Sequence, residues 1–135
     1  MSFSEATHEV ADIVTKVTAR SVTDTVSRLT GLLRSKGIKL FAVIDQSAEA
    51  RGAGLQLRDT TLVIFGSPAA GTPVMAASPL AALDMPLKVL VWADQNRTKV
   101  SYYDPAALAA RHHVGTELAR NLEGIGALTD ALVTP

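Results

Sequence analysis

Three charged residues lie next to apolar stretches of the sequence, where they could do chemistry. Asp45 ends the run KLFAVID, and Asp84 and Lys88 lie in LDMPLKVLVW. Carboxylates in such surroundings cap helices, form ion pairs or act as acids with raised pKa values. We expect structural roles, with Asp45 as a helix cap and Asp84 holding the turn before Pro86. The alternatives are an ion pair of either carboxylate with Lys88, or a shallow cleft in which one carboxylate accepts a proton and Lys88 stabilises an anionic group.

A second candidate is the segment GSPAAGT, which starts at Gly66. Glycines let backbone amides converge on an anion, but no lysine follows Gly71 and the prolines remove donors, so the P-loop motif is absent. We expect a structural turn, and the alternative is a ligand pocket lined by backbone. The candidate residues for a pocket or polar site are Asp45, Gly66, Pro68, Gly71, Thr72, Met75, Asp84, Lys88 and Tyr103.

Two tyrosines and a methionine are the remaining side chains that could line such a pocket. Tyr102 and Tyr103 are adjacent in an expected strand, so they point to opposite faces, and whichever faces the Gly66 segment could contact a ligand. Met75 is expected to fill an irregular gap in the packing. The sequence has no G-x-S-x-G nucleophile motif.

The histidines do not predict a metal site. His112 and His113 are adjacent, so on a helix they point about 100° apart and cannot easily bind one ion together. His8 is remote in the sequence, and the chain has no cysteine. We therefore expect His112 and His113 on the surface at a helix end, and we predict no metal and no cofactor.

The 24 residues between Asp59 and Asp84 have no charged side chain, although 19% of the whole chain is charged. Such a stretch must be buried or covered by a partner. Its prolines and glycines argue against a transmembrane span, and against a long helix or a regular strand through its middle. We expect a strand, a turned and semi-helical connection and a second strand, packed on the core or at the interface of a homodimer.

The rest of the sequence predicts alternating strands and helices. Ser21 followed by Asp24 is typical of a helix start, and Gly37 of a helix end. The segment after Asp94 predicts a turn between two paired strands. The expected strands cover residues 10–19 (with a frayed helix as the alternative), 39–44, 60–65, 87–92 and 98–103, and the expected helices cover 21–37, 47–54, 105–111 and the region from 116 onward, weakened at Gly124 and Gly126.

Composition bounds the class of protein. With 135 residues and 47% hydrophobic content, we expect a single α+β domain over residues 1–135, with a largely antiparallel sheet of about five strands and helices mainly on one face. The formal net charge is zero, which argues against nucleic-acid binding. The N-terminus lacks a basic region before an apolar core, so we expect a cytoplasmic protein without a membrane partner.

Several spaced motifs together resemble the bacterial Domain of Unknown Function 302 family, over roughly residues 22–113. The shared motifs are an Ile-Asp pair before a small-residue helix, the pattern IFG-x-P-x-x-G-T-P-x-M, a D-x-P-L-K strand and a Tyr-Asp-Pro turn. Here they are Ile44 and Asp45; Ile64, Phe65, Gly66, Pro68, Gly71, Thr72, Pro73 and Met75; Asp84, Pro86, Leu87 and Lys88; and Tyr103, Asp104 and Pro105.

The resemblance implies a small α/β domain, a homodimer and no established biochemical activity. In many members a histidine follows the Ile-Asp pair, whereas this chain has Gln46. If that histidine were a catalytic base, this protein would lack it. The sequence therefore predicts a homodimeric domain that binds a small molecule or a protein partner. The alternative is a small hydrolase or isomerase that needs no cofactor and uses Asp45, Asp84 and Lys88.

Overall fold

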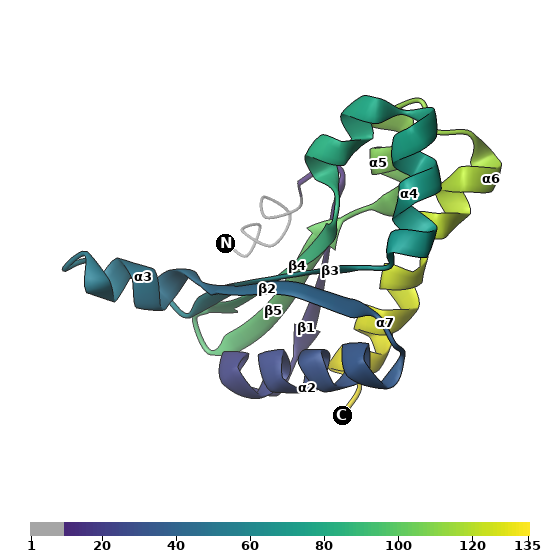
Figure 1. Ribbon diagram of the computed structural model, residues 1–135. Helices are drawn as coiled ribbons and strands as arrows, with labels where there is room; N and C mark the ends of the chain where they lie inside the picture. Colours follow the sequence, from purple (N-terminus) through teal and green to yellow (C-terminus); the bar gives the residue numbers. More distant parts are fainter. Residues whose placement is uncertain (1–9) are drawn as a thin grey trace.

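The computed structural model describes residues 10–135 and is built on one five-stranded antiparallel sheet (Figure 1). The strand order is β1-β5-β4-β3-β2, so β1 and β2 form the two edges. The register of β2 on β3 shifts between Leu40 and Ala42, as at a β-bulge. The α+β class and the antiparallel sheet are thereby confirmed. The strands are β1 Ile13–Thr18, β2 Lys39–Asp45, β3 Thr60–Gly66, β4 Leu87–Asp94 and β5 Arg97–Tyr103.

The helices begin and end close to the capping residues that the sequence predicts. The Ser21 hydroxyl accepts the Asp24 N–H at 3.0 Å, and Gly37 follows the same helix with a φ of +67°. Asp104 caps the helix that starts at Pro105. The helices are α2 Val22–Ser35, α3 Gln46–Gly52, α4 Pro68–Ala77, α5 Pro105–Arg111, α6 Thr116–Ala119 and α7 Gly124–Val133, with 3₁₀ helices η1 Pro79–Asp84 and η2 Arg120–Leu122.

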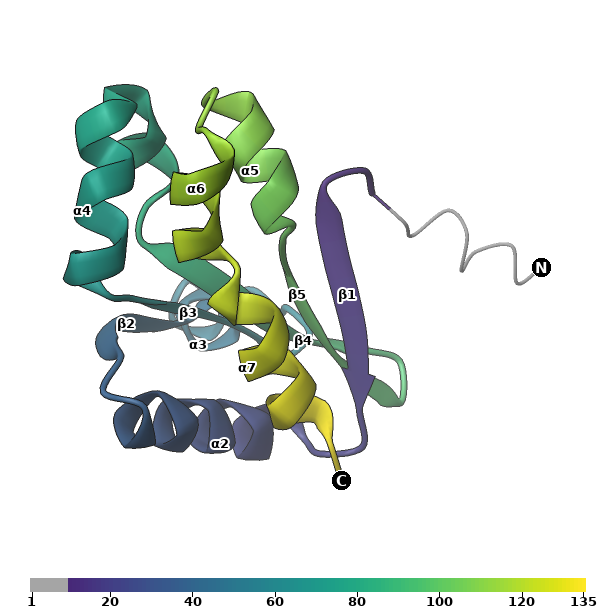
Figure 2. The same ribbon diagram turned by 90° about the vertical axis from the view of Figure 1, so that its right-hand side faces the viewer.

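One face of the sheet carries the main core, because α2 and α7 lie across it (Figure 2). Lys16 of β1 also holds α7, since its ammonium donates to the Thr129 hydroxyl at 2.7 Å and pairs with Asp130 at 2.8 Å. The buried core residues are Val22, Leu29, Leu33, Val63, Phe65, Val89, Val91, Val100, Tyr102, Ile125, Leu128 and Leu132.

The helices α4, α5 and α6, together with η1, gather at one end of the sheet (Figures 1 and 2). Together with η2 they form a small core of their own, which consists of Val74, Ala81, Leu108 and Leu122. In Figure 1 this group stands on the side of the sheet opposite α2. It therefore forms a wall beside the face of the sheet that α2 and α7 leave uncovered.

The uncharged segment differs from the expectation in one respect, because a regular helix, α4, runs through its middle. Pro68 occupies the first turn, where its missing N–H costs nothing, and the Ser67 hydroxyl accepts the Ala70 N–H at 3.3 Å. Pro73 removes one internal hydrogen bond, but burial of Val74 against the small core holds the helix. Gly66 is the last residue of β3 rather than part of a turn, and its φ is not positive.

One other element differs from the prediction. The C-terminal helix is divided into α6, η2 and α7, and α7 starts at Gly124, where the sequence already indicated weakness. Leu55 and Leu57 are both exposed in the connection that precedes β3. Figure 1 shows α3 and this connection projecting beyond the sheet.

Candidate functional site

The face of the sheet turned away from α2 and α7 is apolar in its centre. Leu62 of β3 pairs with Ile44 on one side and Leu90 on the other, and Leu90 pairs with Ser101. Residues directly opposite each other in an antiparallel sheet point to the same face, so these side chains form one row. Each is only half-buried. An uncovered face of an antiparallel sheet is usually polar, so this mainly apolar row is unusual, and apolar patches of this kind are common at interaction sites.

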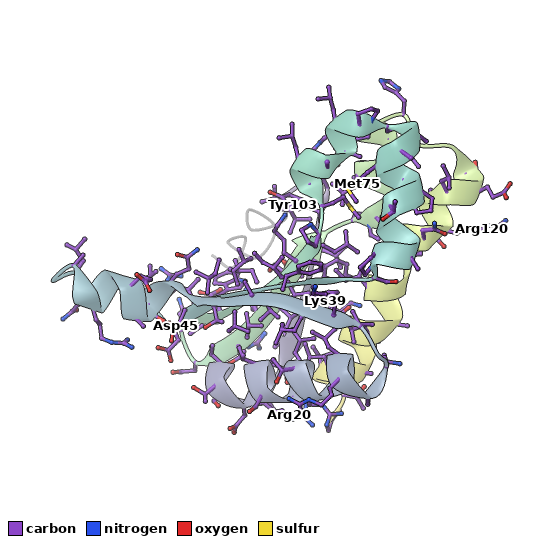
Figure 3. All side chains as sticks on the ribbon, in the orientation of Figure 1. Arg20, Lys39, Asp45, Met75, Tyr103 and Arg120 are labelled. Carbon is purple, nitrogen blue, oxygen red and sulfur yellow. The ribbon has the colours of Figure 1, made fainter. Side chains whose placement is uncertain are left out.

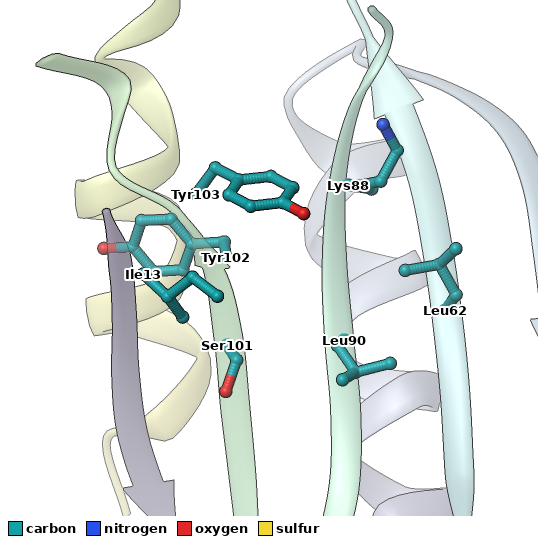
Figure 4. A pocket seen from close by; sticks show the side chains of 7 residues that line it. All are labelled: Ile13, Leu62, Lys88, Leu90, Ser101, Tyr102 and Tyr103. Carbon is teal, nitrogen blue, oxygen red and sulfur yellow. The ribbon is translucent and has the colours of Figure 1, made fainter. Parts of the chain in front are cut away.

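A hollow of about 280 Å³ lies on this face, and we call it the sheet pocket. Strands β1, β3, β4 and β5 all contribute to it (Figure 4). Its lining combines three apolar residues with four residues of β4 and β5 that carry a polar group, of which Tyr102 is buried in the main core. The lining residues are Ile13, Leu62, Lys88, Leu90, Ser101, Tyr102 and Tyr103.

Two of the polar groups in the sheet pocket have no partner within residues 10–135. Ser101 is engaged, because its hydroxyl accepts the Trp92 indole N–H at 2.9 Å and hydrogen-bonds Thr15 at 2.8 Å. Lys88, a residue of intermediate exposure, forms no ion pair or hydrogen bond with any described residue, and the hydroxyl of Tyr103, which is 39% exposed, forms no hydrogen bond with one. The pocket therefore keeps one cation and one hydroxyl available.

Asp84 has other partners than the sequence suggested. Its carboxylate accepts the His112 Nε2–H at 2.6 Å and pairs with Arg111 at 3.2 Å. The hydrogen bond from His112 lowers the pKa of Asp84, and Arg111 adds to this effect against the opposing influence of burial. The alternative of an ion pair with Lys88 is not seen among the described residues, although Asp84, Lys88 and Tyr103 line one narrow crevice. Asp84 thus fastens η1 to α5.

This fastening predicts a pH-dependent loss of stability. The pKa of Asp84 is lower in the folded chain than its ordinary value of 3.8, so its contribution is complete above that value and disappears as pH falls through the folded pKa. We expect Asp84→Asn to lower the free energy of unfolding by about 1 kcal/mol at pH 7, and by progressively less as the pH falls below 3.8, for example at pH 3. Urea unfolding at both pH values measures the difference.

Asp59→Asn is the matched control, because Asp59 is exposed. It should unfold like the unaltered chain at both pH values. An Asp84→Asn variant with the same deficit at pH 7 and at pH 3 would mean that the carboxylate charge does not hold η1 to α5.

A second hollow, of about 210 Å³, lies at the base of α4, and we call it the α4 hollow. It brings together four of the predicted site residues, Gly66, Pro68, Gly71 and Met75. Their neighbours Phe41, Met85 and Pro86 complete an apolar wall, together with Ser67. Thr72, the remaining candidate on this segment, is exposed on α4. The segment therefore forms an apolar surface and shows no cradle of backbone amides around an anion.

Asp45 lies on the other side of the sheet from Lys88. Its carboxylate caps α3 by accepting the Ala48 N–H at 2.9 Å and the Ser47 hydroxyl at 2.7 Å. The hydrogen bond from Ser47 is the main reason that the pKa of Asp45 is lowered, with that from Ala48 next. Asp45 borders a polar groove between α2 and β2 with Thr61, a buried residue of the core face. The structure thus does not bring Asp45, Asp84 and Lys88 together in one cleft.

Sequence reasoning missed the uncovered sheet face and the partner of Asp84. The signal for the face was present, because TTLVIF and LKVLVW have apolar residues at consecutive positions and so on both faces. His112 was expected on the surface, but its side chain is only 11% exposed. Residues 10–135 contain no cluster of three potential metal ligands, and His8 lies outside the described residues.

Comparison with known proteins gives a family and a fold. The family described as "Domain of unknown function DUF302" matches residues 13–131. The "Fluoride-specific ion channel FluC 1" proteins of Brucella suis and Brucella abortus are each 38% identical over 104 residues, which is 76% of this chain and 41% and 38% of those proteins. The chain thus spans about two-fifths of the length of these curated relatives. Within the part of the chain that the structure describes, no helix has the length and apolar character needed to cross a membrane.

One solved structure has a similar fold. It is the crystal structure of an uncharacterized conserved protein DUF302 from Bacillus stearothermophilus, with a TM-score of 0.77 and 17% sequence identity. The match covers 92% of this chain and 97% of that one. At this level of identity the likeness supports the arrangement of strands and helices.

Proposed function

Since the chain belongs to the DUF302 family, we propose that it is a binding domain that takes up a small, largely apolar molecule in the sheet pocket and assembles as a homodimer. The observation that supports this best is the apolar row on the uncovered face of the sheet. Fluoride conduction is not part of the proposal, because the match covers only about two-fifths of the channel proteins.

The pocket suits a ligand because it combines apolar walls with few polar groups. Leu62 and Leu90 form its floor, and Ile13 closes one side (Figure 4). Covering such side chains is favourable by about 25 cal/mol for each Å² of apolar surface removed from water. A pocket lined by apolar side chains with a small number of polar groups is the usual form of a small-molecule site.

The binding proposal is tested with a neutral probe, 4-phenylbutan-1-ol, added to ¹⁵N-labelled protein. We expect backbone amide shifts around Leu62, Leu90 and Tyr103 that saturate with probe concentration. Leu90→Gln places a polar group in the floor and should weaken binding about tenfold. Leu55→Gln, at an exposed position, is the matched control and should bind like the unaltered chain. Shifts that map elsewhere, or that persist unchanged in Leu90→Gln, would refute the pocket.

The proposed dimer contact involves η1 and the adjoining α4 hollow. Leu80 and Leu83 are 72% and 80% exposed, and three residues apart on a 3₁₀ helix they point to the same side. The chain continues through Met85 and Pro86 into the α4 hollow, which extends the apolar surface to Phe41. A stable interface covers about 800 Å² on each partner, so this whole surface is needed rather than two leucines alone. A second copy presents the same apolar patch, as a two-fold contact requires.

A further inference from the structure

We propose that the ligand of the sheet pocket is an organic acid whose carboxylate pairs with Lys88 and Tyr103 and whose apolar body rests on Leu62 and Leu90. This inference rests on the proposed function, because it names the chemical class of molecule for that same pocket. It is argued from the two unpartnered polar groups, their position at one end of the pocket and the apolar character of the rest.

Lys88 is an unusual lysine for this sheet. The same face carries two other lysines: Lys99, which is buried and pairs with Asp94 at 2.8 Å, and Lys39, which is exposed at the edge and lies over the Phe41 ring. Lys88, in contrast, is half-buried beside Leu62 and Leu90 and forms no ion pair with any carboxylate among residues 10–135. Removing an ammonium from water is costly unless an anion compensates it. A bound carboxylate supplies that anion.

Tyr103 provides the second donor at the same end of the pocket. In Figure 4 its ring lies between β5 and β4, with the hydroxyl turned toward the strand that carries Lys88. The guanidinium of Arg111 lies over the Tyr103 ring at 5.8 Å, but it already forms an ion pair with Asp84. The carboxylate of Asp84, in turn, pairs with Arg111 and His112. Its negative charge is therefore compensated, and it should repel an anion bound at Lys88 only weakly.

The donors and the volume favour a small monoanion. Sites for phosphate groups use arginine forks, helix N-termini or several cations, whereas this pocket offers one ammonium and one hydroxyl. Its volume of about 280 Å³ lies just below the usual range of about 300–1,000 Å³ for ligand pockets, so the ligand must be small. A short-chain or aromatic acid therefore fits the chemistry, with its carboxylate at Lys88 and its apolar end over Leu90.

The test compares two molecules that differ only in the charged group, 4-phenylbutanoate and 4-phenylbutan-1-ol, by isothermal titration calorimetry. We expect the unaltered protein to bind the acid at least about tenfold more tightly than the alcohol. Lys88→Met should remove this preference, while Lys88→Arg should keep it. Tyr103→Phe should reduce it by about fivefold. Lys36→Met, at an exposed position at the end of α2, is the control and should leave the preference unchanged.

The outcomes separate this inference from the proposed function. If acid and alcohol bind equally and shift the same pocket amides, the domain binds apolar molecules and the carboxylate inference is wrong. If neither molecule shifts those amides, both the pocket and the acid are refuted. If Lys88→Met still prefers the acid, the carboxylate must bind at another cation, and the inference is also wrong.

Discussion

A Leu80→Lys, Leu83→Lys double variant is expected to sediment as a folded monomer of about 14 kDa under conditions in which the unaltered chain forms a dimer. Both leucines are largely exposed on one side of η1, so the substitutions leave the interior of each copy intact. In a two-fold contact, the two lysines of each copy would place four ammonium groups close together. Their repulsion and desolvation would outweigh the apolar gain.

Analytical ultracentrifugation measures the mass, and a thermal melt shows whether the variant is folded. The control is Leu55→Lys, Leu57→Lys, which introduces the same charges at exposed leucines before β3. The control should remain dimeric. An unaltered chain that sediments as a monomer, or a η1 variant that remains a dimer, would remove this interface from the proposal.

Leu29→Ala is expected to lower the free energy of unfolding by about 2–5 kcal/mol. Leu29 is fully buried, with 0% of its surface exposed, in the core that α2 forms with the sheet and α7. Truncation removes buried apolar surface and leaves a cavity that the β-strands cannot collapse to fill. Because a domain of this size is stable by about 5–15 kcal/mol, the loss is a large part of the total. Urea unfolding followed by circular dichroism measures it.

Leu55→Ala makes the same chemical change at a site that is 66% exposed, and it should change stability by less than about 0.5 kcal/mol. Equal effects of the two substitutions would show that α2 does not cover the sheet as described. The comparison also requires that the slope of unfolding free energy against urea stays the same.

Local signals in the sequence were sufficient to predict most helix starts and strands. The side chains of Ser21, Asp45 and Asp104 each cap a helix by accepting a hydrogen bond from a backbone N–H two or three residues ahead. A few neighbouring residues are therefore enough to predict where these helices start. Helix α4 shows where this reasoning fails. Pro73 disfavours a helix locally, and only the packing of Val74 against residues far along the chain reverses that preference.

The sequence was sufficient to name candidate residues for the site, but not to predict which of them lie together in space. Lys88 and Tyr103 were among the residues proposed from the sequence, and they line one pocket. Their neighbours Ile13 and Leu62 join them only because β5 pairs with β1 and β4 pairs with β3. The partner of Asp84 was missed for the same reason, since His112 is 28 residues away. The order in which the strands pair depends on the whole chain, so it cannot be predicted from a local sequence pattern.

The register shift between Leu40 and Ala42 limits how this protein can associate with itself. A straight edge strand offers an unbroken ladder of donors and acceptors, and copies that add to it one after another grow into fibres. The bulge interrupts that ladder in β2, and the charge of Lys39 at its start opposes a further strand. The bulge and this charge therefore oppose growth by strand addition on this side. In the homodimer proposed above, the two copies would meet through side chains, in a contact that closes after two copies.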